Sequence, residues 1–360
     1  MKLGILTFHS AHNYGAVLQA YAMQEYLCSQ GHDAYIIDYR PEYITRCYPI
    51  SGKSYWASYE IKKIIMGLYN YVACRKIRLR RWYKFEEFFP EKLRLYPYHE
   101  GMDFHEFDAV FIGSDQVWSA PHTDGKFDDM YFGENFKCKA IPYAPSCTHL
   151  VWNDEEKEYL RKHLDSLSAI SVREMQMKEA LQPLTKNDIS VVIDPTLLAG
   201  REHFEKIAAP INNKRPYILT YEIGDHPEVY QMAKTLAKKI DGDVIELVNS
   251  FHHYHRSSMR EGASIEEFLG YIKNAACVLT TSFHGTALSI IFGTPFYTVL
   301  QHSAADNRMT SLLAALDMKD RAINMDDEPD IIPLDTQRVN DNLQKLRKES
   351  EEYIKKSLQL

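Results

Sequence analysis

The residues best suited to chemistry lie together in the stretch TTSFHGTALSIIFGTPF, residues 280–296. The apolar run before it, residues 276–279, predicts a buried strand, and residues 288–292 predict a short buried helix. A glycine and a proline then stop the helix. Four small or polar residues therefore fall between the strand and the interior of the helix: Ser282, His284, Gly285 and Thr286.

This position indicates an anion site. The N-terminus of a helix offers backbone N–H groups without partners and the positive end of the helix dipole, and both favour phosphate or carboxylate. Gly285 would permit close backbone approach, while Ser282 and Thr286 would cap the helix or bind the anion. His284 would bind the anion when charged or transfer a proton near neutral pH. The alternative is a capped helix whose histidine finds its hydrogen-bond partners inside the core and has no role in binding or catalysis.

Two earlier turns carry candidates for contact with a second substrate. The segment FIGSDQVW ends a predicted strand with three polar side chains, Ser114, Asp115 and Gln116. The Asp115 carboxylate could accept a proton from a hydroxyl or orient a histidine, or it could simply cap a helix. In HSAHNYGAVLQAYA, Asn13 can cap a helix that Gly15 opens. This turn lacks G-x-G-x-x-G, which argues against a dinucleotide site.

Two arginines are candidate anion ligands. Arg173 ends the predicted strand in SVRE, and Arg308 lies in DNR after the last strong strand pattern. The planar guanidinium of arginine holds a carboxylate or phosphate through two contacts. The alternatives are a structural ion pair for Arg173, with Glu174 or across domains, and the start of a surface helix for Arg308.

The composition limits the classes of function. The chain has 360 residues, 45% hydrophobic and 25% charged, which is typical of a soluble globular protein with two domains. Its net charge of −7 argues against a general nucleic-acid binder. No apolar run is long enough to span a bilayer, and residues 1–8 are too short for the apolar part of a signal peptide. We therefore expect a cytoplasmic protein.

Neither a structural metal nor a bound cofactor is expected. The six cysteines are scattered without a C-x-x-C pair, which favours reduced thiols over a disulfide frame or a zinc site. HHYH, residues 252–255, invites a metal interpretation. Three histidines in four residues cannot all face one point in regular structure, however, and no acidic or cysteine partner stands nearby.

Apolar runs and helical patterns alternate along the chain. Predicted strands lie at residues 3–8, 34–38, 108–113, 140–144, 169–172 and 190–194, and again at 217–222, 243–248, 276–280 and 296–300. Strands separated by helices predict parallel sheets covered by helices on both faces. With a polar break near residues 209–215, the pattern predicts an α/β fold of two Rossmann-like doubly wound domains facing a cleft, at residues 1–208 and 209–334.

Two further segments are predicted to be helical. Residues 54–97 form an aromatic-rich insertion in the first domain that includes RKIRLRRWYK, residues 75–84. This basic stretch is either a solvated helix or a surface for a phosphate-bearing lipid or polymer. Residues 335–360 carry apolar residues at helical spacing among charges, so we expect a C-terminal helix that packs back on the body.

Taken together, these segments resemble the polysaccharide pyruvyl transferase family. The resemblance covers most of the chain, from GILTFHSAHNYGAVLQAYAM through FIGSDQVW, SVRE and VVIDPTLL. Its most specific part is TTSFHGTALSIIFGTPF followed by DNRMTSLL. The resemblance implies a glycosyltransferase-B-like fold, phosphoenolpyruvate as co-substrate, and a ketal-linked pyruvate on a sugar of a polysaccharide or cell-surface glycan. The acceptor sugar would be lipid-linked or nucleotide-linked.

The resemblance also implies roles for single residues. A histidine and an arginine of the family bind or act on the donor, and their positions here are His284 and Arg173. Some members carry an arginine two residues before that histidine, where this chain has Ser282. Arg308 or Lys273 is a candidate for the missing cation. We assign acid or base work or phosphate contact to His284, and an acceptor hydroxyl to Asp115.

Other functions stay open at this stage. A glycosyltransferase that uses a nucleotide sugar would need the same fold and cleft, with the helix N-terminus holding a diphosphate. A non-catalytic member of the fold would have lost the site. A homo-oligomer, and a peripheral contact with the inner face of the membrane through residues 75–84, are also compatible with the sequence.

Overall fold

The structure, a computed structural model, describes residues 1–48, 61–224, 226–248 and 256–359, and for residues 61–75 it describes the backbone alone. The HHYH stretch lies outside the described residues. The strands of the first half are β1 (Lys2–Leu6), β2 (Asp33–Ile37), β3 (Leu95–Tyr96), β4 (Ala109–Ile112), β5 (Lys139–Pro142), β6 (Ile170–Val172) and β7 (Ile189–Val191). Those of the second half are β8 (Tyr217–Glu222), β9 (Asp243–Val248), β10 (Met259–Arg260), β11 (Cys277–Thr280), β12 (Phe296–Val299) and β13 (Ala322–Ile323).

Helices connect most of these strands. In the first half they are α1 (Tyr14–Ser29), α2 (Glu42–Thr45), α3 (Ile61–Lys92), α4 (Asp154–Ser166), α5 (Met175–Leu181), α6 (Pro195–Ala199) and α7 (Arg201–Ile207). In the second half they are α8 (Pro227–Lys239), α9 (Ile265–Asn274), α10 (Phe283–Phe292), α11 (Asp306–Ala315) and α12 (Thr336–Gln359). Short 3₁₀ turns lie at Ala120–His122, Asp129–Phe132, Gln182–Leu184 and Lys319–Arg321.

Both large sheets are parallel and share one strand order. The five-stranded sheet runs β3-β2-β1-β4-β5, and the six-stranded sheet runs β10-β9-β8-β11-β12-β13. Numbered from the first strand of each sheet, both follow the Rossmann order, in which the winding reverses between the first and fourth strands. The reversal falls between β1 and β4 in one sheet and between β8 and β11 in the other. Ligands of such sheets bind beyond the carboxyl ends of these strands.

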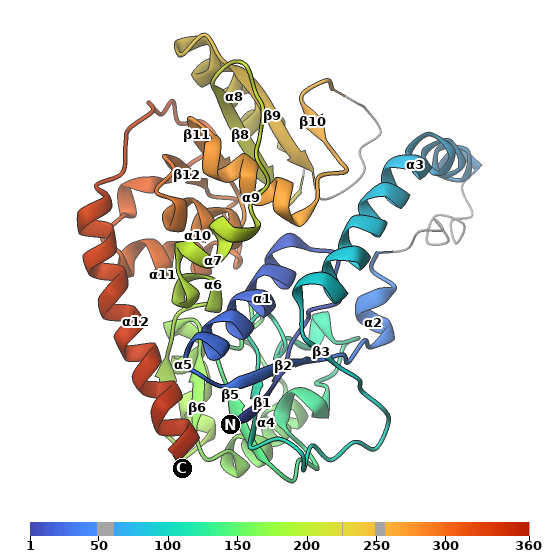
Figure 1. The fold of residues 1–360 in the computed structure, drawn as a ribbon, viewed down its shortest axis with the longest axis vertical. Coiled ribbons are helices and arrows are strands. Elements are labelled where there is room, and N and C mark those ends of the chain that lie inside the picture. The colour runs from blue at the N-terminus through green and yellow to red at the C-terminus, as the bar shows by residue number, and fades with distance from the viewer. Residues whose placement is uncertain (49–60, 225, 249–255, 360) are drawn as a thin grey trace.

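The predicted fold class is confirmed: an α/β protein with two Rossmann-like sheets, in the glycosyltransferase-B-like arrangement. Figure 1 shows the six-stranded sheet in the upper half of the molecule and the five-stranded sheet in the lower half. All four residues of β4 and of β11 are buried, as expected for central strands covered on both faces. The domain limits at residues 208 and 334 stay predictions.

The strands β6 and β7 differ from the expected arrangement. The alternating pattern predicts them within the first large sheet, but they form a two-stranded sheet of their own. Side chains make the connection instead, because Ser171 Oγ donates to the Pro142 carbonyl at 2.9 Å and lies 3.3 Å from the Ala144 amide. The small sheet thus continues the large one without a backbone ladder, and Arg173 at its end stays next to the main cleft.

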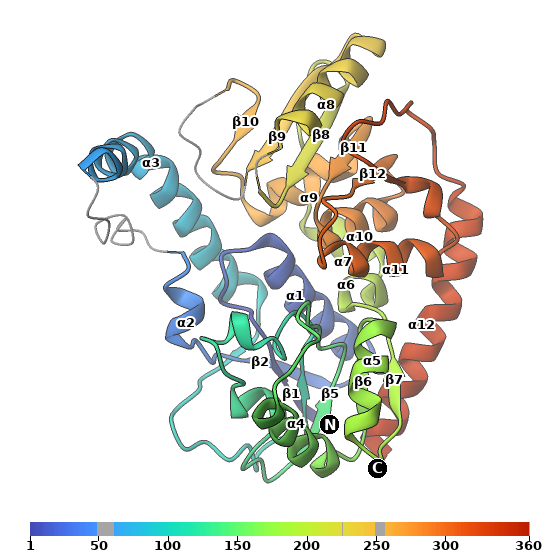
Figure 2. The same cartoon turned by 180° about the vertical axis from the view of Figure 1, so that it is seen from behind.

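Helix α12 runs along one side of the molecule, past both large sheets (Figures 1 and 2). Near its start, Asn342 Nδ2 donates to the Leu316 carbonyl at 3.2 Å, in the second half of the chain. Near its end, Tyr353 Oη donates to the Pro142 carbonyl at 2.7 Å, in the first half. Within the described part of the chain, no helix has the length and apolar character that crossing a membrane requires.

The basic stretch at residues 75–84 lies on α3 and joins the two halves. Arg81 is buried, and its guanidinium donates to the carbonyls of His12, at 3.2 Å, and Val248, at 3.0 Å. Lys84 pairs with Glu267 at 2.6 Å. Arg81 and Lys84 are therefore occupied in contacts within the molecule.

Candidate functional site

His284 is positioned by the strand–turn–helix unit that the sequence predicts. β11 ends at Thr280, Ser282 caps α10 by accepting from the Gly285 amide at 3.5 Å, and Gly293 ends the helix with φ of 69°. His284 is only 8% exposed. It therefore sits in the first turn of α10, held by a short buried helix rather than by a loop.

Helices α1 and α10, one from each half of the chain, meet at His284. Asn13 caps α1 by accepting from the amides of Gly15, at 2.9 Å, and Ala16, at 3.3 Å. A Cβ atom added to Gly15 would lie 2.1 Å from His284 Nδ1, closer than any real contact allows. Gly15 is thus needed for close approach between the two helices, and it lets the α1 N-terminus support the imidazole ring.

Arg173 lies at the centre of a buried charged group. Its Nε donates to Glu174 Oε1 and its Nη1 to Asp194 Oδ2, both at 2.8 Å. Its guanidinium also covers the Phe283 ring at 4.4 Å from the ring centroid. Burial alone would lower the pKa of Arg173, but the charges of Glu174 and Asp194 outweigh it and raise the pKa. Arg173 therefore stays a cation in this buried position.

Asp194 connects Arg173 to His284. Its Oδ2 accepts from Arg173, lies 3.1 Å from Ser114 Oγ, and is 3.7 Å from His284 Nε2. Its Oδ1 accepts from the amide and the hydroxyl of Thr196, which makes it the cap of α6. Burial alone would raise the pKa of Asp194, but the charges of His284 and Arg173 and the Thr196 amide hold it well below its usual range. Asp194 is thus an ionised, fully buried carboxylate.

Three cationic side chains near Asp194 present buried nitrogen atoms without a hydrogen-bond partner. Within the described residues, these atoms are Arg173 Nη2, His284 Nε2 and Arg308 Nε. Leaving a buried polar group unpaired is costly, so such groups are rare in native proteins unless a ligand or water serves them. Three side chains that each present one nitrogen atom without an acceptor indicate a site for an anion.

Arg308 lies in the first turn of α11. Burial, followed by the positive charge of Arg173, lowers the pKa of Arg308. A bound anion would relieve both effects, because it would supply the missing acceptor and screen the repulsion between the two guanidinium groups. The other candidate cation, Lys273, forms an ion pair with Glu205 at 2.9 Å, so its charge already has a partner. The structure therefore leaves Arg308 as the candidate that can replace the cation absent at Ser282.

A cleft of about 610 Å³ opens beside this group. The loops after the four strands at which the winding reverses all contribute to its lining, through Phe8, Asn13, Asp115, Gln116, Ile223 and Thr281. Asp115 has φ of 64° directly after the turn that ends β4 and is half-buried. The cleft therefore lies where a doubly wound fold binds its ligands.

Not every predicted residue reaches this cleft. Ser114 is fully buried, and its Oγ lies 3.0 Å from the Ala144 carbonyl and 3.1 Å from Asp194 Oδ2. It therefore helps to position Asp194 rather than contacting the cleft. A Cβ on Gly285 would lie 2.3 Å from Thr280 Oγ1, and Thr286 Oγ1 bonds Thr298 Oγ1 at 2.7 Å. Both residues of α10 therefore face the sheet, because that side of the helix packs on β11 and β12. We leave them out of the proposed donor site.

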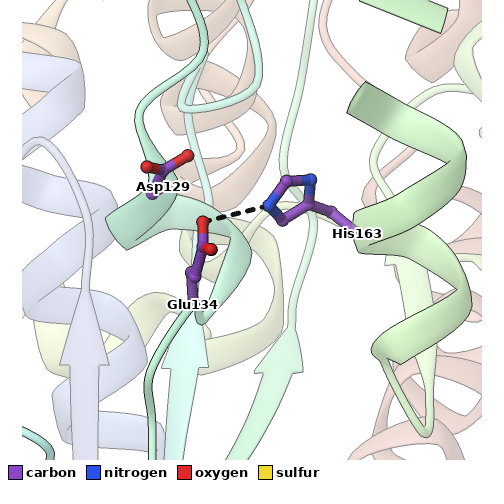
Figure 3. A group of neighbouring side chains, drawn as sticks. All are labelled: Asp129, Glu134 and His163. Atoms are coloured by element: carbon purple, nitrogen blue, oxygen red, sulfur yellow. Dashed lines mark hydrogen bonds and ion pairs between the residues drawn. The ribbon is translucent and has the colours of Figure 1, made fainter. Parts of the chain in front are cut away.

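A possible metal-binding group lies on another part of the molecule. Asp129, Glu134 and His163 offer ligand atoms within 4.8 Å of one another (Figure 3). These side chains already have partners, since His163 Nε2 lies 3.2 Å from Glu134 Oε2 and Tyr159 Oη donates to Asp129 at 2.6 Å. The group is accounted for by these contacts, and none of its members lines the cleft.

Sequence reasoning missed Asp194. It stands in VVIDPTLL, where the run before it reads as a strand and the proline after it as a helix start. An aspartate directly before a proline at the first helical position is a capping signal that could have drawn attention to it. Its contact with His284 and Arg173 depends on how two distant turns meet, which the local pattern does not contain.

The chain matches one family model, described as polysaccharide pyruvyl transferase, over residues 13–303. No curated protein matches it. Among solved structures, the UDP-GlcNAc 2-epimerase from Methanocaldococcus jannaschii is 14% identical, with 96% of this chain and 93% of that chain covered and a TM-score of 0.45.

Two other solved structures are similarly distant. A putative UDP-N-acetylglucosamine 2-epimerase from Listeria monocytogenes is 9% identical, with 98% of this chain and 90% of that chain covered and a TM-score of 0.48. The spinosyn forosaminyltransferase SpnP is 10% identical, with 98% and 95% covered and a TM-score of 0.39. These likenesses are too weak to carry an argument about activity.

Proposed function

Because this chain belongs to the polysaccharide pyruvyl transferase family, we propose that it transfers the enolpyruvyl group of phosphoenolpyruvate to a sugar and forms a ketal-linked pyruvate. Membership makes the chain a transferase. The observation that supports the donor is the group of three buried cations with unpaired nitrogen atoms, Arg173, His284 and Arg308. Phosphoenolpyruvate carries a carboxylate and a phosphate, so it would supply acceptors to all three.

The reaction needs proton transfer and charge stabilisation. A proton adds to the methylene carbon of the donor, which becomes a methyl group and leaves the neighbouring carbon cationic. One sugar hydroxyl attacks that carbon and loses its proton, the carbon–oxygen bond to phosphate breaks, and phosphate leaves with one proton. A second hydroxyl closes the ketal and loses its own proton. Acid–base groups would transfer these protons, and clustered cations would stabilise the developing charge. The proposed reaction uses no cofactor.

We assign the proton donor role to His284. Its Nε2 is buried without a hydrogen-bond partner among the described residues and lies 3.7 Å from the Asp194 carboxylate. Arg173 would hold the donor carboxylate or phosphate. Asp115, which lines the cleft on the opposite sheet, would accept the proton of the attacking hydroxyl. Asn13 and Gln116 line the same cleft and would contact the acceptor.

The cellular setting is part of the proposal. The acceptor would be a lipid-linked or nucleotide-linked sugar in polysaccharide or cell-surface glycan synthesis, in the cytoplasm, and the protein could act as a homo-oligomer. Contact with the inner membrane face would depend on Lys76 and Arg80, which are the exposed cations among the described side chains of residues 75–84.

Calorimetric titration with phosphoenolpyruvate tests the donor. We expect the intact protein to bind it, and His284→Asn and Arg173→Lys to bind it at least about tenfold more weakly, because each loses a charge-assisted contact. Arg161→Ala, an exposed arginine on α4, is the matched control and should bind normally. Thermal unfolding of each variant separates loss of binding from loss of fold.

Two results would contradict the proposal. One is failure of the intact protein to bind phosphoenolpyruvate with and without an extract of lipid-linked glycans, combined with binding of a nucleotide sugar. The other is normal binding and phosphate release by His284→Asn. The first would make the protein a nucleotide-sugar glycosyltransferase, and the second would remove His284 from the chemistry.

A further inference from the structure

Arg308 faces two separate cavities. Besides the cleft of about 610 Å³, a smaller cavity of about 240 Å³ lies between β7, α11 and α12. Of the described residues that line the two cavities, Arg308 is the one that both share. Since its Nε is buried without a hydrogen-bond partner in the described part of the chain, this side chain stands between the cavities with capacity for an anion.

The smaller cavity suits a small anion with an apolar portion. Arg173 and Arg308 lie in its lining, and its walls include the apolar side chains Ile193, Phe283, Leu312 and Leu346. Two carboxylates also line it: Asp194 is already paired with Arg173, and Glu349 is exposed to solvent. Its volume falls below the roughly 300 Å³ at which pockets for drug-sized ligands begin, so a disaccharide would not fit.

The larger cleft also has two arginines in its lining, Arg46 and Arg308, but it is wider and offers more groups that suit a sugar. Its lining includes the carboxylates of Asp115 and Asp124, the amide of Gln116 and the rings of Tyr43 and Tyr48. Carboxylates and amides bond sugar hydroxyls, and aromatic rings cover the apolar faces of sugars. Because Asp124 is paired with Arg46, Asp115 is the cleft carboxylate that would repel a donor with several negative charges.

We propose that these cavities are two substrate chambers, with the enolpyruvyl donor in the smaller one, the sugar in the cleft, and Arg308 at the boundary as the cation that holds the departing phosphate. The inference rests on the proposed function and deepens it. A cation at the boundary would contact phosphate on the donor side while the attacking hydroxyl approaches from the cleft. It would therefore stabilise the charge that develops as the carbon–oxygen bond to phosphate breaks.

Two neighbouring alanines on α11 provide a matched test. Ala315 is exposed and lines the smaller cavity, whereas Ala314 is exposed and lines a different depression. We expect Ala315→Phe to weaken phosphoenolpyruvate binding at least about tenfold by occupying the chamber. Ala314→Phe should change the dissociation constant less than about twofold. Both changes lie at the surface, so both variants should fold.

Two further variants separate the chambers. Cys47 is exposed in the lining of the cleft, so Cys47→Trp should leave donor binding within about twofold of the intact protein and reduce phosphate release when a glycan acceptor is supplied. Arg308→Gln should weaken donor binding about ten- to hundredfold, because it removes a charge-assisted contact. All affinities are measured by calorimetry with phosphoenolpyruvate.

The outcomes distinguish the chamber assignment from the proposed function. If Ala315→Phe binds the donor as well as Ala314→Phe while His284→Asn loses it, the smaller cavity is not the donor chamber, and the proposed function stands. If Cys47→Trp rather than Ala315→Phe loses donor binding, the donor lies in the cleft. If the intact protein binds no phosphoenolpyruvate in any condition, both proposals fail.

Discussion

At the scale of single residues, Asp194 supplies the negative charge at the centre of the buried group formed with Arg173 and His284. It is fully buried, and a single oxygen atom faces both cations that the proposed chemistry uses, Arg173 and His284. Because its pKa is held far below the ordinary range, its negative charge persists at every pH at which the protein is expected to work. Without that charge, Arg173 would keep Glu174 as its ion-pair partner, and His284 would lose the carboxylate that lies 3.7 Å from its Nε2.

Asp194→Asn should therefore destabilise the protein and impair turnover together. We expect the free energy of unfolding to fall by about 3 kcal/mol at neutral pH, because the change removes one of the two carboxylates that compensate the buried Arg173. Urea denaturation measures the loss. Asp154→Asn, a change of an exposed carboxylate at the start of α4, is the control and should cost little.

The difference in free energy of unfolding between the intact protein and Asp194→Asn should depend on pH with a definite sign. The folded pKa of Asp194 is lowered from 3.8, so its contribution to stability is fully present above pH 3.8 and decreases as the pH falls below that value. The gap between intact protein and Asp194→Asn should thus be constant from pH 7 to pH 5 and narrow by about 1.4 kcal/mol for each pH unit below about 4. A gap that is unchanged at pH 3 would mean that the loss comes from packing rather than from charge.

The sequence predicts the cations of the site better than their carboxylate partner. The local sequence pattern shows where strands end and helices begin, and His284, Arg173 and Arg308 stand at such positions. The role of Asp194 depends on a contact between turns far apart in the chain. The close fit of Gly15 against His284 is likewise a product of how two helices meet, and no local pattern contains it.

Ser282 acts at the scale of the element, as the cap of α10. Its side chain accepts from the Gly285 amide, and it lines neither the cleft nor the smaller cavity. Ser282→Ala should lower the free energy of unfolding by about 1 kcal/mol, the typical cost of a lost cap, and change donor affinity by less than about twofold. Ser264→Ala, which removes the cap of α9, is the matched comparison and should cost a similar amount. Loss of donor binding in Ser282→Ala alone would instead make Ser282 a ligand of the anion.

Element types follow from the sequence more closely than element pairing does. The apolar runs at β4 and β11 are short and fully buried, which is why their strand character is plain without a structure. The separation of β6 and β7 from the large sheet is not visible in the same pattern, because it depends on the Ser171 side chain bonding to the backbone at the end of β5. The basic stretch on α3 was ambiguous for a related reason, since burial of Arg81 requires the second half of the chain to be in place.

At the scale of the whole molecule, α12 contacts both halves of the chain, as α3 also does. Asn342 bonds to Leu316 in the second half, Arg347 Nε donates to the Leu197 carbonyl at 2.7 Å, and Tyr353 bonds to Pro142 in the first half. Cleft geometry depends on how the two sheets sit relative to each other. A helix that spans both therefore fixes the distance between Asp115 on one side and Arg308 on the other.

Removal of residues 336–360 should uncouple the two halves. All four tryptophans, at positions 56, 82, 118 and 152, lie in the first half, so tryptophan fluorescence reports its unfolding alone, whereas far-ultraviolet circular dichroism reports both halves. We expect the two urea transitions to coincide in the intact protein and to separate in the shortened one, because coincident probes are the mark of a two-state transition. The milder double variant Arg347→Ala, Tyr353→Phe should separate them partially. Coincident transitions in the shortened protein would show instead that contacts such as the Tyr14 hydroxyl on the Ala263 carbonyl, at 2.8 Å, suffice to couple the sheets.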